Sequence, residues 1–161
     1  MKALTRFGTI MGILNAFRYR SHGMFKFSQS SLDKLATCHP DLIALANECI
    51  RYRDCIILEG HRNEADQNKA FDTGHSKLRW PRGKHNASPS LALDMGYWPN
   101  PYANRSDALY FAGWVTGVAQ GLYNIGKMKN KIRAGADWNR NGLVSDESFS
   151  DLYHFELNLQ E

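Results

Sequence analysis

The segment Leu91-Ala-Leu-Asp-Met-Gly-Tyr-Trp98 decides how the chain folds, because its apolar residues alternate as they do in a half-buried β-strand. Strand side chains point to opposite faces in turn, so Asp94 projects from the face opposite the apolar residues. The apolar face consists of Leu91, Leu93, Met95 and Tyr97. The segment therefore predicts a strand that buries one face and turns a carboxylate away from the core.

A second segment, Tyr153-His-Phe-Glu-Leu157, repeats this arrangement near the end of the sequence. Its apolar face consists of Tyr153, Phe155 and Leu157, whereas His154 and Glu156 project from the other face. Two strands of one sheet could therefore offer the carboxylate of Asp94 and the imidazole of His154 to one shared surface.

The remaining patterns place helices and short strands around these two segments. Strands are predicted over residues 54–59 and 132–134, and a long surface loop over residues 74–89, which are rich in glycine, proline and basic residues. Four helices are predicted. The first is capped by Ser30 or Ser31, and the second has Pro40 in its first turn and apolar residues at helical spacing, namely Leu42, Leu45, Ala46 and Cys49. The third runs from Asn63 to about Thr73, and the fourth carries the apolar stripe Phe111, Val115, Val118, Leu122 and Ile125. Because helices and strands do not alternate strictly, we expect an α+β fold with a small antiparallel sheet and flanking helices.

Composition favours one folded domain and excludes several classes of protein. With 161 residues, of which 43% are hydrophobic, the chain can bury a core without disulfides. The net charge of +4 favours polyanions in general, but no nucleic-acid recognition motif accompanies it, so no nucleic-acid partner is expected. The three cysteines, Cys38, Cys49 and Cys55, form no C-x-x-C pair, which predicts reduced, partly buried thiols rather than a disulfide framework or a thiolate zinc site.

Residues 1–23 are predicted to be a basic leader outside the fold, and residues 24–161 to form the domain. Lys2 and Arg6 precede an apolar run over residues 10–14 that is too short to span a bilayer and lacks a signal-peptide cleavage site. A disordered leader, a translation start at Met24 and a weak amphipathic helix on a membrane surface all stay open. We expect no stable membrane insertion.

A candidate metal site follows from the loop before the first segment. His85 lies close enough in sequence to fold back toward Asp94, and with His154 it gives two imidazoles and a carboxylate. Catalytic zinc commonly takes three such ligands and keeps a further position for water. The H-E-x-x-H helix of common zinc peptidases is absent. Spacing alone leaves open that both histidines are ordinary loop and strand residues.

Two further side chains are candidates for catalysis. Asp151 stands three residues before His154, and a turn there would bring its carboxylate near the metal site as a general base. The alternative is that Asp151 only caps a turn. Arg62 follows the strand that ends at Glu59 and could pair with a substrate carboxylate or steady an oxyanion, or it could be a solvated surface arginine.

Four short motifs follow one another along the chain. They are Glu59-Gly-His-Arg62 followed by Gln67, Lys84-His85 through Ser90-Leu-Ala-Leu-Asp94, Gly135-Ala-Asp-Trp138, and Phe149-Ser-Asp-Leu-Tyr-His-Phe-Glu-Leu157. From Met24 onward the chain thereby resembles the zinc D-alanyl-D-alanine carboxypeptidase and L-alanyl-D-glutamate peptidase family, particularly its phage endolysins. The resemblance implies a single zinc peptidase domain of the type shared with lysostaphin-like enzymes and the hedgehog signalling domain.

The same resemblance implies roles for individual residues. The zinc ligands fall on His85, Asp94 and His154, the catalytic base on Asp151 and the substrate-binding arginine on Arg62. Two departures accompany it. Gly83 stands where the family commonly has a serine, which removes a hydrogen-bonding group, and an insertion of two residues around Ser88-Pro89 is expected to lengthen the loop without moving the ligands.

The function that the resemblance implies is a monomeric zinc metallopeptidase acting on the stem peptides of peptidoglycan. We expect a phage endolysin, an L-alanyl-D-glutamate endopeptidase that causes host cell lysis, held in the host cytoplasm until release and then acting on the periplasmic cell wall. The alternatives are a D-alanyl-D-alanine carboxypeptidase and, in a different class, a non-catalytic zinc domain that binds the cell wall.

A possible second metal site is suggested by Asp137-Trp-Asn-Arg-Asn-Gly-Leu-Val144, which follows the opening of an EF-hand calcium loop. The candidate Ca²⁺ ligands are Asp137, Asn139, Asn141, Leu143 and Glu147. Ser148 occupies the position of the closing glutamate, so Glu147 or Asp146 would have to replace it. The alternative is a turn stabilised by its own side chains. Bound calcium would order the loop that leads into Asp151.

Overall fold

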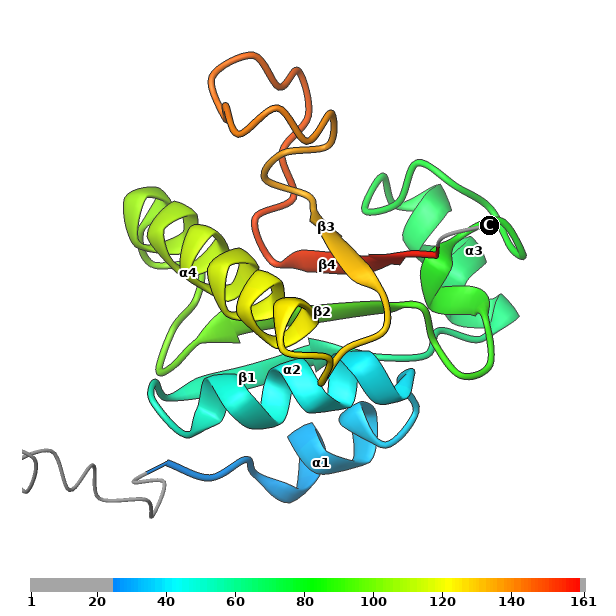
Figure 1. Ribbon diagram of the computed structural model, residues 1–161. Coiled ribbons are helices and arrows are strands. Elements are labelled where there is room, and N and C mark those ends of the chain that lie inside the picture. The colour runs from blue at the N-terminus through cyan, green and yellow to red at the C-terminus, as the bar shows by residue number, and fades with distance from the viewer. Residues whose placement is uncertain (1–24, 160–161) are drawn as a thin grey trace, which may run out of the picture.

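The computed structural model describes residues 25–159 and has a four-stranded sheet at its centre (Figure 1). The strands are β1 (Cys55–Glu59), β2 (Ala92–Tyr97), β3 (Lys131–Ala134) and β4 (His154–Asn158), in the order β1-β2-β4-β3. The helices are α1 (Gln29–Leu35), α2 (Pro40–Ile50), α3 (Glu64–Asp72) and α4 (Arg105–Asn124), with a 3-10 turn, η1 (Lys84–Asn86). All three strand pairs are antiparallel, which confirms the predicted α+β fold. The predicted leader, residues 1–23, lies outside the described residues.

The core forms where helices cover the sheet. Helix α4 packs against β2 and β3, α1 packs against β1, and α2 contacts both α1 and α4. The largest fully buried side chains include Leu42 and Leu45 of α2, Phe111 of α4, Met95 of β2 and Phe155 of β4. Both apolar strand faces predicted from alternation therefore point into the core. No helix among the described residues is long and apolar enough to cross a membrane.

The pairing of β2 with β4 places the two predicted polar faces side by side. Asp94 lies directly opposite His154 in this register, and Ala92 lies opposite Glu156. Side chains of directly opposite residues have Cβ atoms about 4.5–5.5 Å apart. The two central strands thus bring a carboxylate and an imidazole together, as the sequence predicted.

Two details of the predicted helices are wrong. Helix α1 is capped by Ser28 and not by Ser30 or Ser31, because the Ser28 hydroxyl accepts a hydrogen bond from the Ser31 amide at 3.2 Å. Ile125 does not belong to the buried stripe of α4: it caps the helix, the chain turns at Gly126, and its side chain is 68% exposed. The predicted starts at Pro40 and Asn63 are confirmed, the first as N1 of α2 and the second as the N-cap of α3.

The predicted surface loop is also only partly correct. Residues 77–79 are exposed, but His85 and Asn86 are buried in η1. Backbone hydrogen bonds fix this turn, since the Arg62 amide donates to the His85 carbonyl at 2.9 Å and the Leu91 amide donates to the Lys84 carbonyl at 3.0 Å. The end of the loop is therefore an ordered turn, hydrogen-bonded to Arg62 after β1 and to Leu91 before β2.

The three cysteines are free and lie entirely in the core, so the prediction of partly buried thiols underestimated their burial. Burial raises the pKa of the Cys38 thiol to about 11 and that of the Cys55 thiol to about 12. Cys49 is shifted in the same direction for the same reason. These thiols behave as small apolar side chains.

Candidate metal centre

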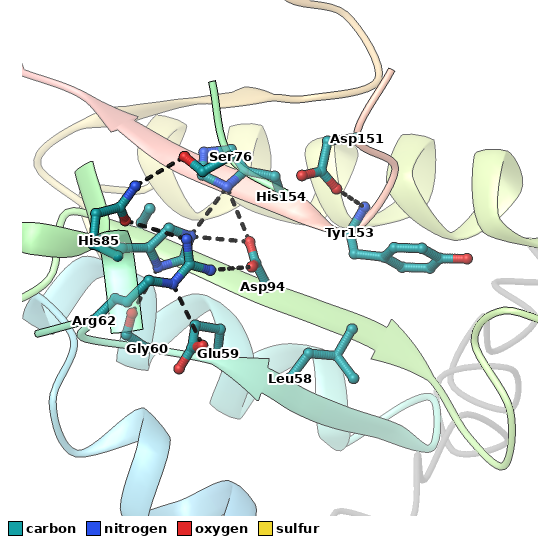
Figure 2. A network of polar contacts seen from close by, with 12 residues as sticks. Leu58, Glu59, Gly60, Arg62, Ser76, His85, Asp94, Asp151, Tyr153 and His154 are labelled. Carbon is teal, nitrogen blue, oxygen red and sulfur yellow. Dashed lines mark hydrogen bonds and ion pairs between the residues drawn. The ribbon is translucent and has the colours of Figure 1, made fainter. Parts of the chain in front are cut away.

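Three side chains from three separate elements converge on one point. His85 comes from η1, Asp94 from β2 and His154 from β4, and Figure 2 shows them pointing toward one another. His85 Nε2 lies 3.1 Å from Asp94 Oδ1 and 3.2 Å from His154 Nδ1, and His154 Nδ1 lies 2.9 Å from Asp94 Oδ1. Among residues 25–159, this is the one group of three or more His, Cys, Asp or Glu side chains arranged closely enough to hold a metal ion.

Each imidazole has a hydrogen-bond acceptor on the side away from this point, and this acceptor determines which ring nitrogen carries the proton. His85 Nδ1 lies 2.6 Å from the Gly60 carbonyl, which can only accept, so Nδ1 carries the proton and Nε2 offers a lone pair. His154 Nε2 lies 3.0 Å from Glu156 Oε2. Burial by itself would raise the pKa of Glu156, but His154 and Arg133 lower it below its usual value, so this carboxylate also accepts. His154 Nδ1 therefore offers its lone pair to the same point as His85.

The carboxylate at this point is ionised. Burial alone would raise the pKa of Asp94, but the neighbouring His85 and His154 hold it well below its usual range. Arg62 adds a positive charge, with Nη2 lying 3.8 Å from Asp94 Oδ2. Two lone pairs and a carboxylate oxygen thus face one another across about 3 Å.

Three such acceptors repel one another unless a positive charge lies between them. Ligands about 2.0–2.2 Å from a tetrahedral metal ion lie roughly 3.3–3.6 Å apart, and the observed separations of 2.9–3.2 Å are only slightly shorter. A proton on His154 would compete with a metal ion for this position. Burial would lower the pKa of His154, but the carboxylates of Asp94 and Glu156 on either side raise this pKa to about 9. The donor set therefore fits a divalent cation that displaces this proton.

Asp151 lies at the edge of the same site, in the turn that leads into β4 (Figure 2). Its carboxylate accepts a hydrogen bond from the Tyr153 amide at 3.4 Å, so it does cap a turn, and it also lines the pocket beside the three converging side chains. Burial first, and the charge of Asp94 second, raise its pKa. A side chain at Gly135 would collide with the Asp151 backbone, which explains the glycine. Asp151 is thus a carboxyl with raised proton affinity at the site.

Arg62 is held by acidic groups of the protein itself. Its Nε lies 3.6 Å from Glu59 Oε2, Nη2 lies near Asp94, and Nη1 donates to Gln67 Oε1 at 3.3 Å. Its side chain is only 16% exposed. The alternative of a solvated surface arginine is therefore wrong, and the guanidinium lies beside one of the converging carboxylates.

A pocket of about 280 Å³ opens beside these groups. Residues 75–78 and 82–84 line one part of it, and Trp138 and Phe149 line another. The Trp138 ring stacks on Phe149 at 6.2 Å between centroids and lies 5.4 Å from the His154 ring. The sequence assigned no role to either aromatic residue, although each belongs to one of the four motifs.

The position of Gly83 accounts for one departure from the family pattern. A Cβ atom there would lie 2.9 Å from Asn86 Oδ1 and 3.4 Å from Gln67 Oε1. Asn86 Oδ1 instead accepts a hydrogen bond from the Gly83 amide at 2.9 Å. The side chain of Asn86 thus occupies the space that a serine at position 83 would need.

The predicted calcium loop is closed by its own hydrogen bonds. Asp137 accepts from the amides of Asn141 and Gly142 at 3.1 and 2.9 Å. Asp146 faces the side-chain amides of Asn139 and Asn141 at 3.2 and 2.6 Å. Glu147 instead accepts from the Asn139 backbone amide at 3.1 Å, and the Leu143 amide donates to Asn141 Oδ1 at 2.8 Å. This is the arrangement of a side-chain-stabilised turn, and calcium binding stays a prediction.

The fold and the site together define a class of protein. A sheet that offers two imidazole nitrogens and a carboxylate to one point, beside a further carboxyl with raised proton affinity, has the groups that a metal-dependent hydrolase uses. Comparison with known proteins then gives the family: residues 23–158 match the sequence model of the phage L-alanyl-D-glutamate peptidases, and the chain belongs to that family. The resemblance predicted from the motifs is confirmed.

Individual relatives agree with this assignment. The L-alanyl-D-glutamate peptidase of Escherichia phage T5 is 31% identical over 140 residues, which cover 83% of this chain and 98% of the relative. Among solved structures, the L-Ala D-Glu endopeptidase ChiX of Serratia marcescens matches with a TM-score of 0.59 at 19% identity, covering 83% of this chain and 91% of that one. At 19% identity, the similarity to the Serratia structure shows a shared fold and no more.

Proposed function

We propose that this protein is a zinc-dependent L-alanyl-D-glutamate endopeptidase that cuts the stem peptides of peptidoglycan and acts as a phage endolysin. The observation that carries the proposal is the convergence of His85, Asp94 and His154 beside Asp151, in a chain whose family is that of phage L-alanyl-D-glutamate peptidases. The names of the phage T5 and Serratia peptidases identify the bond that we assign to this chain.

The ligand chemistry favours zinc over Ca²⁺ and Mg²⁺. Two imidazole nitrogens with one carboxylate oxygen suit zinc, whereas Ca²⁺ and Mg²⁺ prefer sites made of oxygen atoms. When bound, zinc would supply Lewis acidity that polarises a scissile carbonyl and lowers the pKa of a water molecule to about 7.

The side chains of the protein carry the remaining chemistry. Asp151, whose pKa is raised, takes the proton from the attacking water and returns it to the nitrogen of the leaving amine. Arg62 steadies the negative charge that develops on the carbonyl oxygen, and its ion pair with Asp94 holds that ligand in place. Trp138 and Phe149 form an apolar wall beside these groups.

Analysis of digested cell wall tests the proposal directly. Purified peptidoglycan is incubated with the protein, and the fragments are identified by mass spectrometry, with and without a zinc chelator. The expected result is metal-dependent release of stem peptides that begin with glutamate. Release of free alanine would instead identify a D-alanyl-D-alanine carboxypeptidase, and binding without cleavage would identify a non-catalytic wall-binding domain.

The way in which the protein acts in the cell is part of the same proposal. We infer that residues 24–161 form one monomeric domain that stays in the host cytoplasm until release and then acts on the periplasmic wall. The family match over residues 23–158 supports this domain extent. Light scattering of the purified protein tests the monomer, and a mass corresponding to a dimer would contradict it.

A further inference from the structure

The pocket beside the candidate metal centre carries an excess of positive charge. Five cationic side chains line it, against three carboxylates, which leaves two positive charges in excess when the histidines are neutral. The cationic residues are Arg62, Lys77, Arg82, Lys84 and Arg133, and the acidic residues are Asp94, Asp151 and Glu156. A bound divalent cation would add to this excess. Such a pocket attracts a negatively charged substrate.

Protein carboxylates already balance two of the five cations. Arg62 lies near Glu59 and Asp94, and Arg133 Nη2 lies 2.6 Å from Glu156 Oε1. In the described part of the chain, Lys77, Arg82 and Lys84 have no carboxylate within 4.0 Å. The unbalanced charge of the pocket is therefore concentrated on one wall, over residues 77–84.

This wall is held in place by a buried glutamine. Gln67 is 1% exposed, and its amide nitrogen donates to Ser76 Oγ at 2.8 Å and to the Leu78 carbonyl. Its oxygen accepts from Arg62 and from Asn86 Nδ2, at 3.3 and 3.1 Å. One side chain thus connects α3 to the loop, to Arg62 after β1 and to η1. Gln67 holds the chain at Leu78 and at Asn86, on either side of Arg82 and Lys84, which restrains this wall and lowers the cost of binding.

We propose that Arg82 and Lys84 receive a free carboxylate of the substrate and make the protein selective for an acidic group next to the scissile bond. The inference rests on the proposed function. A glutamyl residue has two carboxyl groups and the chain continues through only one, so the other stays beside the bond, either as the acid or as an amide. A guanidinium can bind that carboxylate through two parallel hydrogen bonds, and an ammonium adds a second charge.

Arg79 provides a matched control within the same loop. Its Nη2 lies 2.5 Å from Asp72 Oδ1, its guanidinium carbon lies 4.4 Å from the centre of the Phe71 ring, and it does not line the pocket. Arg79→Gln removes the same charge from the same loop without changing the pocket wall. A general loss of positive charge would affect all three variants alike, whereas a carboxylate site would distinguish them.

The experiment uses two synthetic stem peptides that differ only in this carboxyl group, which is a free acid in one and a primary amide in the other. Dissociation constants are measured by calorimetry on non-hydrolysable analogues of both peptides, for the wild-type protein, Arg82→Gln, Lys84→Gln and Arg79→Gln. Cleavage of the peptides themselves is followed in parallel by mass spectrometry. Wild-type protein is expected to bind the acid about five- to tenfold more tightly than the amide. Arg82→Gln and Lys84→Gln should each lose about two- to fivefold of that preference, and Arg79→Gln should retain it.

Binding and cleavage separate this inference from the proposed function. A wild-type preference for the acid that both Arg82→Gln and Lys84→Gln retain would place the carboxylate elsewhere and overturn the inference, as would equal or unmeasurable binding of the two peptides. Binding that prefers the acid without cleavage of either peptide would contradict the endopeptidase and leave the carboxylate site standing. Circular dichroism confirms that each variant is folded.

Discussion

At the scale of single residues, each imidazole of the candidate metal centre is oriented by an acceptor on its far side. The Gly60 carbonyl holds His85 and the Glu156 carboxylate holds His154, so both inward nitrogens are unprotonated when the imidazoles are neutral. Such outer partners fix ring orientation and raise the basicity of the ligand. The site depends on these two acceptors as well as on the three converging side chains.

Substitution of the converging residues should separate metal binding from turnover. His154→Ala and Asp94→Ala are expected to lose both metal and lytic activity, because two donors alone hold a catalytic zinc weakly. Asp151→Ala should keep the metal and lower kcat by about 10²- to 10⁴-fold, since Asp151 lines the pocket without belonging to the donor set. Metal content is measured by mass spectrometry and lysis by turbidity. A wild-type rate for Asp151→Ala would refute its role as the base.

Glu156 gives a second test at this scale. Glu156→Gln keeps the shape of the side chain but removes the charge that accepts from His154 and pairs with Arg133. We expect zinc affinity to fall by about 10- to 100-fold, as measured by competition with a chromogenic chelator. Glu64→Gln removes an exposed carboxylate from the first turn of α3 and serves as the control. Equal zinc affinities of the two variants would show that Glu156 does not position His154.

At the scale of elements, alternation predicted the faces of the strands but not how they pair. The apolar faces of β2 and β4 follow from their sequences alone, and so does the outward projection of Asp94 and His154. That these two residues lie directly opposite depends on the register of the β2–β4 pair, which the alternation within each strand does not specify. Local spacing therefore predicted which residues could meet, while tertiary packing decided that they do.

Helix ends show the same limit. Asn63 and Pro40 were predictable because their effect is local: a side chain or a ring that suits the first turn. Ser31 looked equally suitable as a cap, but its hydroxyl accepts from the Ile57 amide of β1 at 3.2 Å and is buried. A contact across 26 residues of sequence overrode the local signal.

The predicted calcium loop between β3 and β4, which stands out from the sheet in Figure 1, can be tested at this scale. Asp146 faces both asparagine side chains of the loop, whereas Glu147 contacts only a backbone amide. If the loop binds Ca²⁺, Asp146→Asn should therefore weaken binding more than Glu147→Gln in a calorimetric titration. The absence of heat on adding Ca²⁺ to the wild-type protein would leave the loop as a turn stabilised by its own side chains.

At the scale of the whole molecule, the sequence predicted the fold class and the converging residues but not the pocket. The family motifs contain Gln67 and Trp138, yet their sequence positions do not show that the first holds a loop against Arg62 or that the second stacks beside His154. Both contacts join segments that are distant in the chain. A periodic pattern reports burial and exposure, and says little about which distant partner fills a given space.

Metal binding should stabilise the whole domain, because its three ligands come from η1, β2 and β4. Zinc at 100 times its dissociation constant would add about 2.7 kcal/mol to the free energy of unfolding. For a domain of this size that corresponds to a rise in Tm of roughly 5–11 °C. Thermal unfolding followed by circular dichroism measures the shift, which a chelator should reverse. His154→Ala is the control and should show almost none of it.

The three core thiols have a consequence for where this chain can function. No described residue takes part in a disulfide, and the raised pKa values of Cys38 and Cys55 keep their sulfurs protonated and unreactive near neutral pH. Buried, protonated thiols oxidise slowly, so we expect the domain to stay free of disulfides under reducing and oxidising conditions alike. Its folding would then need no oxidative maturation, and transfer between compartments of different redox potential is expected to leave the fold unchanged.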